Sequence, residues 1–228
     1  MKNSTIFGVL ITVAVKKYLV LAILFLLPIT AYLFFATGVN NFVKLPTLTE
    51  NVQELHRFVD SDGAPIVLED RITVLVFFGN ELEARKANAF NLAHKIYKKN
   101  HQFEEFQFVT LITSGQVDEA VALKDELAEI ENPKDWKFAV GTAEAIQDVF
   151  FSLRSDGALN ENFATDYVFI IDKQRNLRGR TDDEDVGMLY GYDASNYAEI
   201  NNKMSDDIKV VLAEYRLALK KYKADREI

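Results

Sequence analysis

The longest apolar run of the chain lies near its start, where residues Tyr18–Phe35 read YLVLAILFLLPITAYLFF. The uncharged stretch continues as far as Val43. A helix of about 20 apolar residues spans the hydrocarbon core of a bilayer, so residues 18–39 are predicted to form one transmembrane helix. A cleaved signal peptide is the alternative, with Ala36 and Gly38 as the small residues before the cut.

Two lysines, Lys16 and Lys17, directly precede this run. The positive-inside rule therefore places residues 1–17 in the cytoplasm or at the membrane interface. The chain after the predicted helix then lies on the other side, as a periplasmic or otherwise extracytoplasmic domain. This arrangement predicts a single-pass protein of the inner membrane, whose N-terminal helix contacts membrane lipid.

The pattern changes after the apolar run. Residues 40–54 are more polar and contain Pro46, which predicts an extended linker. Over residues 55–228, unbroken β-branched and aromatic runs predict strands that are covered on both faces. The expected strands are a hairpin in His56–Leu68, two central strands at Arg71–Phe78 and Phe106–Ile112, a short one at Trp136–Val140, and a pair at Tyr167–Asp172 and Leu177–Arg180.

Apolar positions at helical spacing separate these strands. The expected helices are Glu81–Lys99, Val117–Glu131, Ala143–Leu153 and a last helix from near Ser195 past Tyr215. Alternation of strands and helices, followed by a strand pair and a helix, predicts an α/β domain with a mixed sheet and helices on both faces.

The charge distribution limits the partners of this domain. The whole chain has 26 basic and 34 acidic side chains, a net charge of −8. Residues 1–43 carry three lysines and no acid, so the rest carries 23 basic and 34 acidic side chains, a net charge of −11. Because nucleic acid binding needs a basic surface, nucleic acid is not an expected partner.

The chain contains no cysteine. A disulfide, a thiol nucleophile and a cysteine-ligated metal are therefore excluded. No cofactor is expected.

Four segments of the domain follow one another in the order DSDGAPIVLEDRITVLVFFGN, DWKFAVGTAEAIQDVF, YVFIIDKQRNLRGR and GYDASNYAEINNKMSDDIKVVL. Together they resemble the Sco/SenC family, whose members are membrane-anchored thioredoxin-like proteins that help to build the copper centre of cytochrome oxidase. The resemblance implies a thioredoxin-like fold for residues 55–228, and a membrane protein complex of the respiratory oxidase type as partner.

The positions that carry the family's chemistry differ in this chain. The family has Cys-x-x-x-Cys after the first core strand, and these two positions fall near Asn80 or Glu81 and near Ala84 or Arg85. The family's histidine position falls at Ala164. Cu(I) is selected by soft sulfur ligands, so copper insertion and thiol reduction by the family's mechanism are excluded. No catalytic residue and no metal ligand is predicted, and the chain is expected not to be an enzyme.

Two groups of carboxylates have alternative interpretations. Glu81 and Glu83 form either a hard-cation or acid–base site or the acidic first turn of a helix, where they offset the macrodipole. Residues 182–185 read Asp-Asp-Glu-Asp. This acidic loop (Asp182, Asp183, Glu184 and Asp185) is predicted to be a solvated turn or a docking patch rather than a calcium loop, whose oxygens are spaced differently.

Two functions follow from these expectations. The first is a non-catalytic, Sco-like accessory or assembly subunit of a membrane complex, in which the anchor helix, residues 79–85 and the acidic loop do the binding. The second is a carboxylate-based metal-binding protein or enzyme that uses Glu81 and Glu83.

Overall fold

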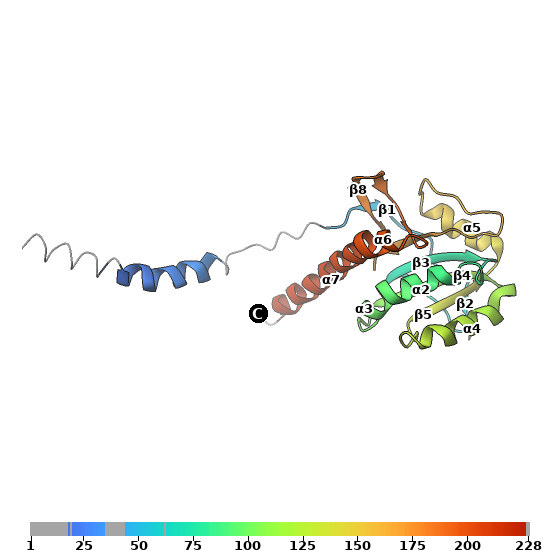
Figure 1. Ribbon diagram of the computed structural model, residues 1–228, viewed down its shortest axis with the longest axis horizontal. Coiled ribbons are helices and arrows are strands. Elements are labelled where there is room, and N and C mark those ends of the chain that lie inside the picture. The colour runs from blue at the N-terminus through green and yellow to red at the C-terminus, as the bar shows by residue number, and fades with distance from the viewer. Residues whose placement is uncertain (1–17, 19, 35–43, 62, 227–228) are drawn as a thin grey trace, which may run out of the picture. The chain divides into compact units, whose positions relative to one another are not determined.

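The computed structural model describes residues 18, 20–34, 44–61 and 63–226. The chain divides into two compact units, residues 1–42 and residues 43–228. Figure 1 shows the helix of the first unit and the α/β domain of the second.

In the first unit, residues 20–34 are helical and their large apolar side chains are exposed. The hydroxyl of Thr30 donates to the carbonyl oxygens of Leu26 and Leu27, so this polar group is satisfied within the helix. Among the helices that the structure describes, none is both long enough and apolar enough to cross a membrane. The anchor predicted at residues 18–39 lies partly outside the described residues.

The second unit is built on one mixed sheet. Parallel pairing joins β3 to β4 and β4 to β5, and β3 also pairs antiparallel with β6. Over the described residues, the strand order is β1-β7-β6-β3-β4-β5-β2, and β10 pairs with β6. The strands are β1 (Thr47–Thr49), β2 (Val59–Asp60), β3 (Ile72–Gly79), β4 (Phe106–Thr113), β5 (Trp136–Gly141), β6 (Tyr167–Ile171), β7 (Leu177–Arg178) and β10 (Tyr192–Asp193).

A separate two-stranded hairpin follows β7. It consists of β8 (Arg180–Asp183) and β9 (Gly187–Leu189), which pair antiparallel. The acidic segment predicted at residues 182–185 therefore forms the end of β8 and the turn of this hairpin.

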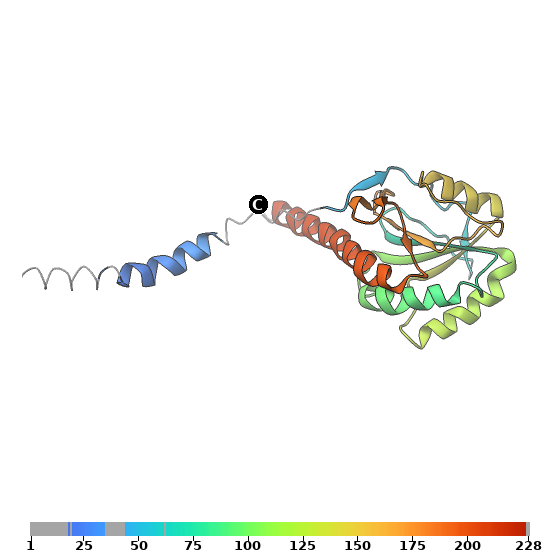
Figure 2. The same cartoon turned by 45° about the horizontal axis from the view of Figure 1, so that its top comes forward.

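Helices cover both faces of the sheet (Figure 2). Helix α5 (Ala143–Ser152) packs on one face, while α4 (Val117–Ala128), α7 (Ser205–Arg226) and the segment after β3 pack on the other. That segment consists of α2 (Lys86–Leu92), a π-helical stretch (Ala93–Tyr97) and α3 (Lys98–Asn100). A 3-10 turn (Ser114–Gln116) precedes α4, whereas α6 (Tyr197–Glu199) and a second π-helical stretch (Ile200–Met204) precede α7.

The alternation of side chains along β3 explains why its stretch from Val74 to Phe78 shows no polar positions. Val74, Val76 and Phe78 belong to the core on the α2, α4 and α7 side. Leu75 and Phe77 belong to the core on the α5 side. Because successive residues of a strand point to opposite faces, a strand covered on both faces is largely apolar, as the sequence predicted. Its polar side chain, Thr73, is buried and accepts a hydrogen bond from Gln107.

The segment predicted as a linker differs from the expectation. Within it, Thr47–Thr49 forms β1 and pairs with β7, and Leu45 and Val52 are buried in the domain core. Three residues are too short to show a strand pattern, so this edge strand is determined by its tertiary contacts.

A buried ion cluster holds this segment against β7 and α7. The Arg178 guanidinium lies 3.2 Å from the Asp172 carboxylate and 2.9 Å from that of Glu214, and the three side chains are at most 11% exposed. Arg178 also donates to the carbonyl oxygen of Leu45 from Nε, at 2.9 Å. The guanidinium thus compensates two buried charges and one buried carbonyl group.

Arg178→Met is expected to destabilise the full chain strongly, because it leaves two buried carboxylates without their counter-charge. Removal of one partner from a buried ion pair costs about 3–5 kcal/mol, which chemical denaturation will measure. The control is Lys209→Met, which breaks the exposed pair between Lys209 and Asp206 and should change stability by less than about 1 kcal/mol. Equal effects of the two substitutions would contradict the role of the cluster.

Candidate functional site

The positions that match the family's metal site lie where the turn after β3 meets the loop between α5 and β6. The backbone N–H of Asn80 donates to the carbonyl oxygen of Asn162 at 2.9 Å, and that of Thr165 donates to the carbonyl oxygen of Phe77 at 3.0 Å. Gly79 lies at this contact with a φ of +50°. A Cβ atom there would be 2.1 Å from the Asn162 carbonyl oxygen, so only glycine permits the approach.

The carboxylate of Glu81 is fully engaged by this loop. Asn162 donates from Nδ2 to Oε1 of Glu81 at 2.8 Å, and Asn160 donates from Nδ2 to Oε2 at 2.9 Å. Arg85 donates to the same Oε2, from Nε at 3.2 Å, and its Nη2 lies 3.0 Å away. Both carboxylate oxygens therefore have partners within the protein.

Arg85 continues the network to the start of β6. Its guanidinium also pairs with the carboxylate of Asp166, which accepts a second hydrogen bond from Nδ2 of Asn88 at 2.7 Å. The Arg85 side chain is 12% exposed and lies between the two acids. We call Glu81, Arg85, Asp166, Asn160 and Asn162 the polar clamp, because these residues join the turn after β3 to residues 160–166.

The clamp changes the protonation of Glu81. Its pKa is lowered from the ordinary value of 4.5, first by the hydrogen bonds from Asn160 and Asn162 and then by Arg85, against the opposing effect of burial. Glu81 is therefore an ionised structural group near neutral pH. A general acid at neutral pH needs a raised pKa instead.

The remaining predicted site residues take no part in the clamp. Ala84 and Glu83 are exposed, and Glu83 lies 3.9 Å from Lys86. Asn80 accepts a hydrogen bond from the Thr113 hydroxyl, while Ala164, at the family's histidine position, is buried. In the described part of the chain, no three His, Asp or Glu side chains gather as metal ligands do.

One interpretation of Glu81 and Glu83 is wrong. Helix α2 begins at Lys86 rather than at Glu81, and its first turn has no acidic residue. The two acids therefore do not offset its macrodipole. The physical reason is that Glu81 binds the asparagines of a distant loop, and the chain passes through a turn before the helix begins.

The acidic loop is divided between structural and exposed side chains. Asp183 is buried and binds Lys203 Nζ at 2.7 Å, and Asp185 binds the same amine at 2.6 Å. Hydrogen bonding to Lys203 lowers the pKa of Asp183 despite its burial. Asp182 and Glu184 are exposed. Two of the four predicted docking residues, Asp183 and Asp185, are thus held in ion pairs with Lys203 of the π-helical stretch that precedes α7.

Sequence reasoning missed the partners of Glu81. Asn160, Asn162 and Asp166 lie about eighty positions further along the chain, in a segment without periodicity. One available signal was the spacing of Glu81 and Arg85, because a carboxylate and a cation four residues apart meet on one helical face.

Comparisons with known proteins agree with the fold. No family model matches the chain, and no curated protein matches its sequence. A candidate electron transport protein from Aquifex aeolicus VF5 is similar in structure, with a TM-score of 0.50 and 15% identity over 74% of this chain and 98% of that one.

Two Sco proteins are also among the similar solved structures. Copper-bound ScoI of Arabidopsis thaliana has a TM-score of 0.42 and 14% identity over 67% of this chain and 94% of that one. Copper-bound ScoI of Bradyrhizobium japonicum has a TM-score of 0.44 and 9% identity over 71% and 99%. The mixed sheet with helices on both faces gives the domain a thioredoxin-like fold, as the sequence predicted, and the likeness to solved structures concerns the fold alone.

The lowered pKa of Glu81 predicts a pH dependence of stability. Its ionised form is stabilised by folding, so this contribution is present above the unfolded value near 4.5 and is lost as pH falls through the lower folded pKa. Glu81→Gln should therefore destabilise the protein at about pH 7 and make less difference at about pH 3. Denaturation of both proteins across this range is the measurement, and a difference that is independent of pH would contradict the assignment.

The close approach at Gly79 makes a second prediction. Gly79→Ala forces residues 160–163 away from the turn and should cost more than about 1 kcal/mol of stability. Gly115→Ala is the matched control, because a Cβ atom there meets no atom within 4 Å. Thermal or chemical unfolding compares the two variants, and a neutral Gly79→Ala would show that the two loops do not need this contact.

Proposed function

We propose that this chain is a non-catalytic, Sco-like subunit of a membrane protein complex, held at the membrane by residues 18–39 with its α/β domain on the extracytoplasmic side. Its role is to bind and position partner subunits during assembly or in the finished complex. The complex is of the respiratory oxidase type. The assignment to this type of complex rests on the family resemblance of the sequence, since a shared fold by itself does not specify function.

The polar clamp is the observation that carries the proposal. The positions of the family's two cysteines fall near Asn80 or Glu81 and near Ala84 or Arg85. Of these residues, Glu81 and Arg85 bind each other and the loop 160–166. An ion pair that also has hydrogen-bond partners in both loops is suited to holding the two loops in fixed relation. It supplies no thiolate, and its carboxylate oxygens already have partners.

The N-terminal segment supports the membrane location. Twenty-six consecutive residues from Tyr18 to Val43 carry no charge. The described helix at 20–34 exposes almost all of its large apolar side chains, an arrangement that is unfavourable in water. A lipid environment would remove this cost.

The alternative function, a hard-cation or acid–base site at Glu81 and Glu83, has less support. Glu81 is occupied by Asn160, Asn162 and Arg85, and Glu83 is 74% exposed and points to Lys86. A hard cation takes six or more oxygen ligands, and each Glu81 oxygen bound to a cation would have to leave its present donor.

The proposal is tested by gentle isolation of the tagged full-length protein from native membranes, followed by identification of the co-purifying proteins. Reproducible recovery with subunits of one membrane complex is expected. The recovery should persist in Glu83→Gln, since this exposed carboxylate has no role in the proposal.

The matched control replaces residues 1–39 with a cleavable signal peptide, which releases the domain from the membrane. Recovery of partners should fall, because tethering raises the local concentration of the domain. Isolation of the wild-type protein alone, as a monomer, would contradict the proposed function.

A further inference from the structure

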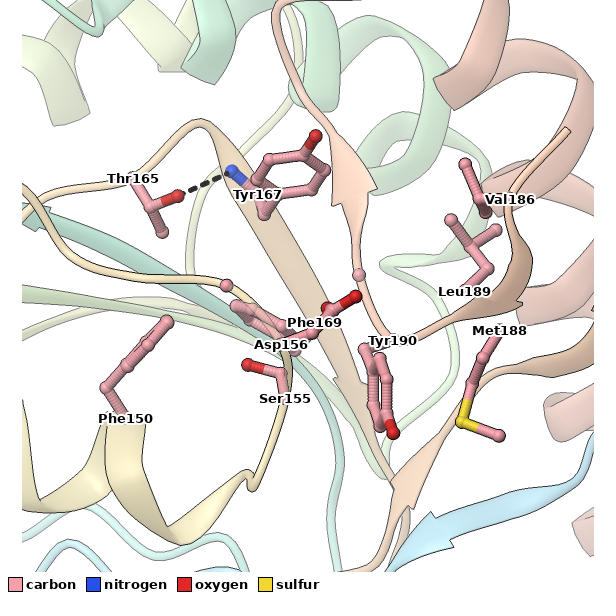
Figure 3. A pocket seen from close by; sticks show the side chains of 12 residues that line it. Phe150, Ser155, Asp156, Thr165, Tyr167, Phe169, Val186, Met188, Leu189 and Tyr190 are labelled. Atoms are coloured by element: carbon pink, nitrogen blue, oxygen red, sulfur yellow. Dashed lines mark hydrogen bonds between the residues drawn. The ribbon is translucent and has the colours of Figure 1, made fainter.

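A cavity of about 240 Å³ lies between the end of α5, the start of β6 and the end of the β8–β9 hairpin. Figure 3 shows its lining, with Phe150 on one side and Tyr190 and Met188 on the other. The cavity is separate from the polar clamp residues, although Thr165 next to Asp166 lines it. Pockets for whole ligands usually measure about 300–1,000 Å³, so this cavity is the size of a single side chain.

Its walls are mainly apolar and partly open to solvent. Phe150, Phe169 and Leu189 are buried lining residues, whereas Tyr167, Val186 and Met188 are 47%, 61% and 43% exposed. Exposed apolar side chains around a concave surface are typical of binding sites. Burial of these groups by a partner would be favourable.

One polar atom of the lining lacks a partner. The Ser155 hydroxyl oxygen is buried, and among the described residues it forms no hydrogen bond. A buried polar group without a partner costs about 1–3 kcal/mol. A polypeptide has both N–H and C=O groups beside every side chain, and so it can satisfy this hydroxyl while its side chain fills the cavity. A hydrocarbon chain cannot.

The charge around the cavity is negative. Asp156 is the one charged side chain of the described lining, and it forms no ion pair with any described residue. The carboxylates of Asp193, Glu199, Asp156 and Asp166 add to the effect of burial in raising the pKa of Tyr167. The part of the chain after residue 43 has a net charge of −11. This field attracts a cationic partner.

We propose that the cavity binds an aliphatic or aromatic side chain of an extended segment from a partner protein, with a lysine or arginine beside it that pairs with Asp156. The segment's backbone bonds the Ser155 hydroxyl. This inference rests on the proposed function and names the surface through which that function is exerted.

Methionine methyl NMR on the full-length protein in nanodiscs is the test. The chain has three methionines, Met1, Met188 and Met204. Met188 lines the cavity, and the buried Met204 is an internal control. The probe is the blocked peptide Lys-Ala-Phe-Ala-Lys, compared with Lys-Ala-Ala-Ala-Lys and Glu-Ala-Phe-Ala-Glu.

The first peptide should shift the Met188 signal in a saturable way and leave Met204 unchanged. The other two should bind at least about tenfold more weakly, since one lacks the buried ring and the other reverses the charge. Asp156→Asn should weaken the first peptide roughly two- to fivefold.

Two further variants provide the matched comparison. Gly157→Leu should abolish binding, because a Cβ atom there already contacts Phe150 and Ser155 at 3.7 and 3.9 Å and a longer side chain enters the cavity. Phe151→Ser should retain binding, since Phe151 is 71% exposed on the same helix but does not line the cavity.

Three results would overturn the proposal. They are no Met188 shift at about millimolar peptide, equal binding of the acidic peptide, and a Met188 signal that follows the lipid composition of the nanodisc without peptide. Failure of this inference can be distinguished from failure of the proposed function. If membrane isolation recovers the same partners with wild type and Gly157→Leu, the pocket is not their binding site while the function stands.

Discussion

An ion pair between Glu81 and Arg85, extended by Asp166 and two asparagines, joins two parts of the domain that are about eighty residues apart in sequence. The arrangement of the neighbouring elements depends on it. The carbonyl oxygen of Asn162 also accepts a hydrogen bond from the backbone N–H of Asn80. The same loop approaches Gly79 so closely that there is no space for a Cβ atom at this residue. The start of β6 and the turn before α2 are therefore fixed relative to each other, and Thr165 and Tyr167 are fixed as walls of the neighbouring cavity.

Such a clamp has consequences for function. A site that binds a metal or a thiol partner needs open ligand positions, whereas both oxygens of Glu81 already accept hydrogen bonds from groups of the protein itself. Rigid elements position binding surfaces well. A thioredoxin-like scaffold whose turn after β3 is held by a polar network is suited to recognition by shape and charge.

Most of the fold could be predicted from the sequence because the signals were local. The apolar run of β3 reflects the burial of this strand on both faces. The four-residue spacing of Leu123 and Leu127 reflects the single buried face of α4. The start of α2 was not predictable in this way. Glu81 and Glu83 are favourable residues for a first helical turn. Helix α2 nevertheless begins at Lys86, and Glu81 instead binds asparagines that are distant in the sequence.

The site itself was only half visible. The resemblance placed the site near Asn80 or Glu81 and near Ala84 or Arg85. The four-residue spacing of Glu81 and Arg85 was a signal for an ion pair, but no prediction was drawn from it. The loop that completes the clamp contains Phe163 in the left-handed region, at φ 60°, an uncommon conformation for a bulky residue. Asn160 accepts hydrogen bonds from the backbone N–H groups of Asn162, Phe163 and Ala164, which hold this turn locally. Its contact with Glu81 is tertiary, and no local pattern encodes it. The hairpin β8–β9 was missed for a similar reason, since its acidic residues resemble a loop until Lys203 is placed beside them.

The central claim is that Glu81 stabilises the domain by accepting hydrogen bonds from Asn160 and Asn162 of the distant loop. A double-mutant cycle with Glu81→Ala and Asn162→Ala, measured by equilibrium denaturation, tests it most directly. The account predicts a coupling free energy of about 1–2 kcal/mol. Additivity of the two substitutions within about 0.3 kcal/mol would contradict it.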